Sequence, residues 1–133
     1  MNLNLNKVIL LGRIASEIIH NKLDKDNVAV FFVATNRKWK DRSGIRKEQA
    51  TFHKVVCFGA IADTINKLGT KGEVVLVEGR IQHKDFPDEN NRIMKKDIMI
   101  VCEKFQLGSE NFKNNVNKEE EKEVEIDWSE FDL

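Results

Sequence analysis

Residues Gln49–Gly59 read Gln-Ala-Thr-Phe-His-Lys-Val-Val-Cys-Phe-Gly. The stretch has no proline, is rich in β-branched and aromatic residues and closes on a glycine, which is typical of a β-strand. Because side chains alternate across a strand, Phe52, Lys54 and Phe58 share one face and His53 lies on the other. A base can stack on each ring and a phosphate can pair with the ammonium, so this face has the chemistry that single-stranded nucleic acid needs. A core strand with one lysine reaching solvent explains these residues equally well.

The segments on either side of this stretch predict further strands. Residues 7–14 are continuously apolar around Gly12, which predicts a strand buried on both faces and bent at the glycine. Residues 28–35 and 74–84 also have strand composition, and residues 93–107 supply the last strand or two.

A single short helix is predicted between two of these strands. Ile61, Ile65 and Leu68 fall on one helical stripe, and Gly69 follows as a C-terminal cap. About five strands, mostly antiparallel, with a helix after the third predict an all-β, five-stranded Greek-key barrel of the oligonucleotide/oligosaccharide-binding (OB) type, with the helix between strands 3 and 4. An open β-sandwich would give a similar pattern.

Two more segments combine cations with rings. Residues 36–48 hold six basic residues around Trp39, with Ser43-Gly44 as a turn signal, and predict a long hairpin connection. A ring flanked by lysines indicates a binding site, although a solvated loop with an incidental tryptophan remains the alternative. Lys84 and Phe86 fall on one side of the strand from residue 74, if that strand extends so far.

Composition excludes several classes of protein. The 133 residues fit one domain, and no apolar run approaches the ~18 residues that span a bilayer, so we expect an intracellular protein without membrane contact. Cys57 and Cys102 lie in apolar runs and predict buried, reduced thiols. The three histidines show no spacing typical of a catalytic or metal site, and no phosphate-cradling glycine loop occurs. We therefore expect no catalytic residue, no metal and no cofactor.

The formal net charge of zero hides a segregation along the chain. Residues 1–108 hold 19 Lys and Arg against 13 Asp and Glu, a balance of +6, whereas residues 109–133 hold 3 against 9, a balance of −6. A basic body with an acidic tail indicates an anionic ligand for the body and a separate role for the tail.

An ordered set of short motifs resembles the bacterial single-stranded DNA-binding protein family over residues 6–108. The matching segments are Asn6–Gly12, Ala34-Thr35, Trp39, Phe52–Val56, Phe58-Gly59, Lys71-Gly72 and Val77–Ile81. Each motif is weak alone, but their order and near-constant spacing are specific. The resemblance implies an OB-fold domain over residues 1–108 that assembles as a homotetramer in the cytoplasm, with the nucleoid, and serves DNA replication, recombination and repair.

The resemblance also assigns roles to residues. The stacking rings would be Trp39, Phe52, Phe58 and Phe86, and the phosphate-binding cations would be Lys7, Lys40, Arg42, Lys47, Lys54 and Lys84. His53 matches a position at the family's subunit interface; without the resemblance, a neutral histidine at a core edge is the better interpretation. The alternative function is a related OB module that binds RNA or serves a primosome mainly through protein contacts.

The tail, residues 109–133, departs from the family pattern. It lacks the family's Gly- and Pro-rich linker and its terminal phenylalanine, but acids still alternate with apolar residues near the end. We expect a flexible, disordered segment that docks on replication and repair proteins. The docking residues would be Asp127, Trp128, Phe131, Asp132 and Leu133. A solvated acidic tail or a strand-like segment is the alternative.

Overall fold

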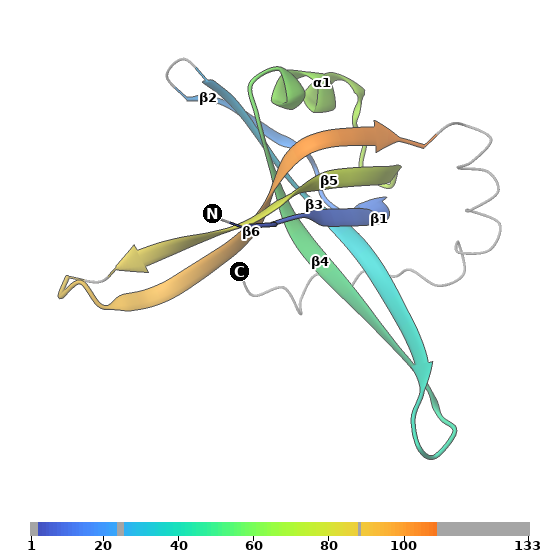
Figure 1. The fold of residues 1–133 in the computed structure, drawn as a ribbon. Helices are drawn as coiled ribbons and strands as arrows, with labels where there is room; N and C mark the ends of the chain where they lie inside the picture. The colour runs from blue at the N-terminus through green and yellow to red at the C-terminus, as the bar shows by residue number, and fades with distance from the viewer. Residues whose placement is uncertain (1–2, 24–25, 88, 109–133) are drawn as a thin grey trace.

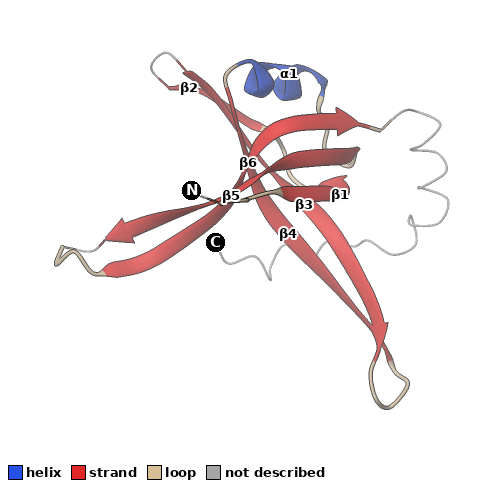
Figure 2. Cartoon of the chain, in the orientation of Figure 1, coloured by secondary structure: helices blue, strands red, loops and turns tan. Residues whose placement is uncertain are grey.

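The computed structural model describes residues 3–23, 26–87 and 89–108, which form six strands and one helix (Figures 1 and 2). The elements in chain order are β1 (Val8–Ile14), β2 (Ile19–Leu23), β3 (Asp26–Lys40), β4 (Arg46–Phe58), α1 (Ala60–Leu68), β5 (Val74–Pro87) and β6 (Ile93–Leu107). The tail residues assigned to partner docking lie outside the described part of the chain.

Five of the strands close into a barrel. The sheet order is β1-β5-β6-β4-β3-β2, and an additional pairing of β1 with β3 closes the ring. All pairings are antiparallel except the short contact of β4 with β6. The predicted five-stranded barrel, with its helix between the third and fourth barrel strands, is confirmed. The extra strand β2, which pairs only with β3, was not predicted.

The core fills the barrel and the space beneath α1. Phe31, Val33, Val55 and Val77 are fully buried inside, and the helix adds Ala62 and Ile65. Leu68, the third residue of the apolar stripe, lies at the last turn of α1 and is exposed, so the stripe is buried only in part. Gly69 does end the helix, and its backbone N–H donates to the Ile65 carbonyl at 2.8 Å.

Strand β1 is buried on one face only, so the prediction of burial on both faces was wrong. Ile9 and Leu11 point to solvent, whereas Val8 and Leu10 pack against the core. Gly12 lies where β1 passes from β5 to β3, and a Cβ there would collide with the Ala34 backbone. The glycine is therefore required by close backbone approach.

Two hairpins extend beyond the barrel as long two-stranded ribbons (Figure 1). Strands β3 and β4 stay paired out to Lys40 and Arg46, and β5 and β6 out to Pro87 and Ile93. The predicted loop over residues 36–48 is thus mostly strand, with only residues 41–45 forming the turn. Gly44 has φ 78°, a left-handed conformation that glycine adopts without strain.

The two cysteines are buried free thiols, as predicted. They lie on neighbouring strands, Cys57 on β4 and Cys102 on β6. A hydrogen bond with Cys102, together with burial, raises the pKa of the Cys57 thiol and keeps it protonated. Within the described residues, no helix is long and apolar enough to cross a membrane.

Candidate nucleic-acid interface

The side chains of β4 alternate as predicted. Phe52 and Lys54 are half-buried and Phe58 is 49% exposed on one face, while Val55 and Cys57 face the core. Val56 belongs to the same face as the rings but is buried. The face therefore has a ring at each end, Phe52 and Phe58, with Lys54 and the buried Val56 between them.

The β5–β6 ribbon brings a third ring and a second cation to this surface. The Lys84 ammonium lies 5.4 Å from the centre of the Phe86 ring, which is 41% exposed. Asp97 on β6 is the cross-strand partner of Lys84 and therefore shares its face. The Asp97 carboxylate also accepts a 2.7 Å hydrogen bond from the Lys54 ammonium of β4. This contact joins the Phe58 strand to the Phe86 ribbon, and we call the surface around Phe52, Lys54, Phe58, Lys84 and Phe86 the aromatic–basic face.

Trp39 does not lie on the aromatic–basic face. It pairs with Lys47, five ladder positions from the Ala34–Phe52 pair, and this odd number places it on the His53 side of the ribbon. The ring is 37% exposed, and the Arg37 guanidinium lies 5.0 Å from its centre. Arg37 was not among the predicted site residues, although its spacing of two residues from Trp39 on one strand is the signal that could have identified it.

The remaining predicted cations are spread over the surface. Lys40, Arg42 and Lys47 are exposed along or at the tip of the β3–β4 ribbon. Asp41 orders this tip, because its carboxylate accepts hydrogen bonds from the backbone N–H groups of Ser43 and Ile45, each at 2.9 Å. Lys7 precedes β1 and pairs with Glu78 at 3.5 Å. Of the predicted cations, only Lys54 and Lys84 thus belong to the aromatic–basic face, and the other four lie on the β3–β4 ribbon or before β1.

His53 projects from β4 on the side away from Phe52. Its Nε2 lies 2.9 Å from the Thr35 hydroxyl, and burial lowers the pKa of the imidazole below its ordinary value. Ile81 and Ile98 share this inner side of the strands, beyond the end of the barrel, and both are exposed. His53 therefore borders an apolar surface, on the side of β4 away from Phe52 and Phe58.

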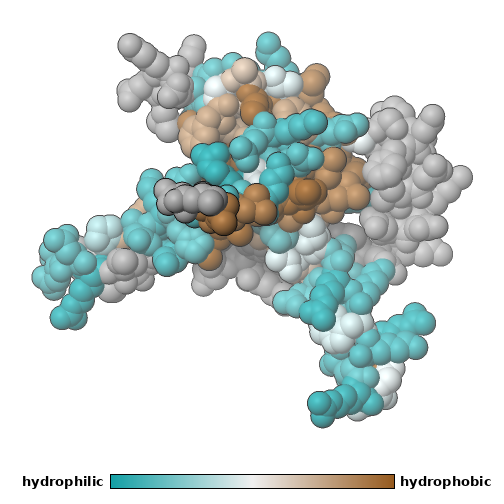
Figure 3. All heavy atoms as spheres, in the orientation of Figure 1, coloured by the Kyte–Doolittle hydropathy of each residue, from teal (hydrophilic) through white to brown (hydrophobic). Residues whose placement is uncertain are grey.

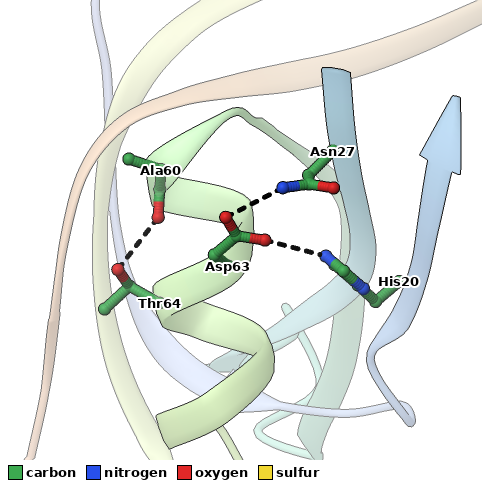
Figure 4. A network of polar contacts seen from close by, with 5 residues as sticks. All are labelled: His20, Asn27, Ala60, Asp63 and Thr64. Carbon is green, nitrogen blue, oxygen red and sulfur yellow. Dashed lines mark hydrogen bonds and ion pairs between the residues drawn. The ribbon is translucent and has the colours of Figure 1, made fainter. Parts of the chain in front are cut away.

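A separate polar network ties α1 to the strands beside it (Figure 4). The Asp63 carboxylate accepts a 2.8 Å hydrogen bond from the Asn27 amide and lies 3.2 Å from Nε2 of His20. The Thr64 hydroxyl donates to the Ala60 carbonyl at 2.9 Å within the helix. The network holds the helix over the barrel. Among the described residues, no group of three or more His, Cys, Asp or Glu side chains could hold a metal.

Comparison with known proteins assigns this chain to a family. The model of the single-strand binding protein family matches residues 5–108, which is the whole barrel with both ribbons. The chain belongs to the single-strand binding protein family. Members of this family are non-enzymatic DNA-binding proteins, and the family resemblance predicted from the motifs is confirmed.

Curated relatives carry the same family's name. The chain is 32% identical over 104 residues to "Single-stranded DNA-binding protein 1" of Chlorobaculum tepidum, covering 77% of this chain and 64% of the relative. It is 31% identical over 121 residues to the single-stranded DNA-binding protein of Aquifex aeolicus, covering 90% and 81%. The matched part thus spans just under two thirds of the Chlorobaculum relative.

Solved structures of single-strand binding proteins have the same barrel. The Plasmodium falciparum protein in complex with single-stranded DNA superposes with a TM-score of 0.71 at 30% identity, over 81% of this chain and 96% of that one. The Thermus aquaticus single-stranded DNA binding protein superposes with a TM-score of 0.67 at 21% identity, over 80% and 51%, and supports the fold alone.

Proposed function

We propose that this chain binds single-stranded DNA without sequence preference, through its barrel and ribbons. The observation that carries the proposal is the aromatic–basic face, where Phe58 and Phe86 are exposed and Lys84 lies against the Phe86 ring. The names of the matched relatives, and the single-stranded DNA in the Plasmodium complex, support the same conclusion. Cellular DNA as ligand would place the protein with the nucleoid in the cytoplasm.

Two terms contribute to the proposed binding. Bases that stack on Trp39, Phe52, Phe58 and Phe86 contribute about 1–3 kcal/mol each, and every base offers a ring face, so sequence matters little. Cations that displace counterions from phosphates make log affinity fall with log salt by roughly 0.7 per phosphate neutralised. Duplex DNA is excluded because its bases already stack on one another.

Competition among nucleic acids tests the proposal. A labelled dT oligomer bound to the full chain is challenged with unlabelled single-stranded DNA, duplex DNA or single-stranded RNA of equal length. We expect the single-stranded DNA to compete far more strongly than the duplex. Preference for RNA would instead favour the alternative of an RNA-binding OB module, and absence of dT binding would favour a protein-interaction factor.

Assembly into a homotetramer is the second part of the proposal. A closed tetramer with dihedral symmetry uses two different self-complementary interfaces. The described part of the chain exposes apolar residues on two separate surfaces, Ile9 and Leu11 on β1, and Ile81 and Ile98 next to His53. Apolar surface gathers over β1, whereas the two ribbons are hydrophilic (Figure 3).

Sedimentation of a β1 variant tests this assembly. We expect four chains per particle for the natural protein and a smaller particle for Leu11→Glu, which places a charge on the exposed face of β1. Leu68→Glu, an equal change at an exposed position of α1, is the control and should leave the mass unchanged. A monomeric natural protein would contradict the proposal.

The acidic tail, residues 109–133, is proposed as a docking segment for replication and repair proteins. Its end combines carboxylates with Trp128, Phe131 and Leu133, which suits an apolar pocket rimmed by basic residues. Truncation after Ser109 should abolish partner binding in a pull-down and, at low salt, tighten DNA binding by removing a competing polyanion. Unchanged partner capture by the truncated chain would rule out this role.

A further inference from the structure

Asp97 places a negative charge on the aromatic–basic face. Its carboxylate contacts one lysine predicted to bind phosphate, Lys54 on β4, at 2.7 Å, and Asp97 is the cross-strand partner of another, Lys84 on β5. A carboxylate at this place opposes the binding of a polyanion to both. The question is therefore what a carboxylate does on a surface that is proposed to bind a polyanion.

The contact with Lys54 is strong for a pair near the surface. A distance of 2.7 Å is that of a charge-assisted hydrogen bond in good geometry. The side chains are only 29% and 20% exposed, so solvent and salt screen the pair less than they screen exposed charges. A DNA phosphate that approaches Lys54 must compete with this carboxylate.

We propose that Asp97 is a positioning residue that occupies Lys54 in place of a phosphate, so that the Lys54–Asp97 pair adds no net phosphate contact to the interface. The pair fixes β4 against the β5–β6 ribbon, and thereby the Phe58 strand against the Phe86 ribbon. The pair also lowers the affinity for DNA, and the dependence of that affinity on salt, below the values expected if every lysine on the face bound a phosphate. This inference rests on the proposed single-stranded DNA binding.

The test is the salt dependence of dT affinity in three proteins: the natural chain, Asp97→Asn and the double variant Asp97→Asn with Lys54→Met. Asparagine keeps the shape of the side chain and its acceptor oxygen. In Asp97→Asn we expect affinity to rise about fivefold, the worth of one partly exposed pair. The log–log salt slope should steepen by about 0.7, because Lys54 is now available to one phosphate. The double variant should return to the natural slope.

Asp85→Asn is the matched control. Asp85 is exposed on the same ribbon, but it pairs with Lys96 and lies on the opposite face from Lys84. Asp85→Asn removes one negative charge from the same ribbon without changing the Lys54 pair. We therefore expect a smaller rise in dT affinity than in Asp97→Asn and no change in the log–log salt slope. Equal effects of Asp85→Asn and Asp97→Asn would reduce the result to a change in net charge and overturn the inference.

Two further results would overturn it. A slope that falls by about 0.7 in the double variant would mean that Lys54 binds a phosphate in spite of Asp97. An unchanged slope in Asp97→Asn would mean that Lys54 is remote from the DNA. If Asp97→Asn does not fold, Asp97→Ser makes the same charge change with a smaller side chain. Failure of the natural chain to bind dT would instead remove the proposed function itself.

Discussion

At the scale of single residues, the alternation of side chains along a strand determines which cation lies beside the Trp39 ring. Arg37 precedes it by two positions on the same side of β3, and this spacing brings the guanidinium to 5.0 Å from the ring centre. Ring and cation together offer a stacking surface beside a positive charge. Phe58 and Phe86 have no indole, so Trp39 can be observed by its own fluorescence once the second tryptophan, Trp128, is replaced.

Trp39 fluorescence is therefore the first prediction. In a Trp128→Phe variant, where Trp39 is the only indole, saturating dT should quench the emission because a base stacks on the ring. Duplex DNA of the same length is the control and should quench little. Full binding of dT, measured by anisotropy of a labelled oligomer, with unquenched Trp39 would argue against stacking at this residue.

His53 gives a prediction for stability as a function of pH. Burial lowers its pKa, so the unfolded chain, with a pKa near the ordinary value of about 6.5, takes up the proton first as pH falls. The stability that His53 contributes is complete above about pH 6.5 and is lost as pH falls toward the folded pKa. Denaturant unfolding at one protein concentration should show a smaller loss between neutral and acidic pH for His53→Gln. Identical pH profiles for the two proteins would contradict this assignment.

Several residue assignments could be made from sequence because they depend on strand alternation alone. The exposure of Phe58 and Phe86 and the inward position of Cys57 follow from period two. The side of Trp39 could not be predicted, because residues 36–40 were interpreted as loop and not as strand. The pairing of Lys54 with Asp97 joins residues 43 positions apart and leaves no local signal.

At the scale of elements, the β3–β4 ribbon differs from the barrel strands in its burial. All residues of the β3–β4 ribbon from 36 to 51, except Asp41, are exposed, so this ribbon adds little to the core. It carries Lys40, Arg42, Arg46 and Lys47 beyond the barrel. The ribbon is therefore expected to contribute to binding and not to stability.

Shortening this ribbon tests the division of roles. Lys38 and Glu48 are cross-strand partners, so an Asn-Gly turn can replace residues 39–47 between them. We expect nearly unchanged thermal stability and a salt slope for dT binding that is smaller by about 2–3, since four cations are lost. A full-length variant with glutamine at those four positions should show the same slope but keep the stacking of Trp39. A marked loss of stability in the shortened chain would contradict the assignment.

Helix α1 provides a test of the packing. Ile65 is fully buried and Leu68 is exposed, although both fall on the apolar stripe of the sequence. Ile65→Ala should lower the free energy of unfolding by about 2–5 kcal/mol, because it leaves a cavity under the helix. Leu68→Ala should change it by less than about 0.5 kcal/mol. Similar losses for the two, measured by denaturant unfolding, would mean that the helix packs with a different face.

Element types could be predicted where one period dominates, as in β4, β5 and α1. Strand β2 was missed because Ile19–Leu23 has polar residues between its two apolar ends and no regular alternation. The single-sided burial of β1 was missed because its outer face is as apolar as its inner face. The sequence alone does not distinguish an apolar strand face that the chain buries from one that it leaves exposed.

At the scale of the whole molecule, we propose that different surfaces carry different functions. The aromatic–basic face with the two ribbons is assigned to DNA, and the apolar surfaces of β1 and around Ile98 are assigned to other copies of the chain. Charge is also divided along the sequence, because the body is basic and the tail is acidic. The sequence predicts a DNA-binding body, a separate tail and an interface position at His53, but which apolar surfaces this chain leaves uncovered could be known only from the structure.

The central claim is that exposed rings on the aromatic–basic face hold the bases of a single strand. The most direct measurement is the dT affinity of a Phe58→Leu, Phe86→Leu double variant, in which apolar bulk is kept and the rings are lost. We predict a weakening of about 1–3 kcal/mol for each ring with an unchanged salt slope, because stacking releases no counterions. Leu68→Ala, on the exposed side of α1, is the control. Natural affinity in the double variant would contradict the account.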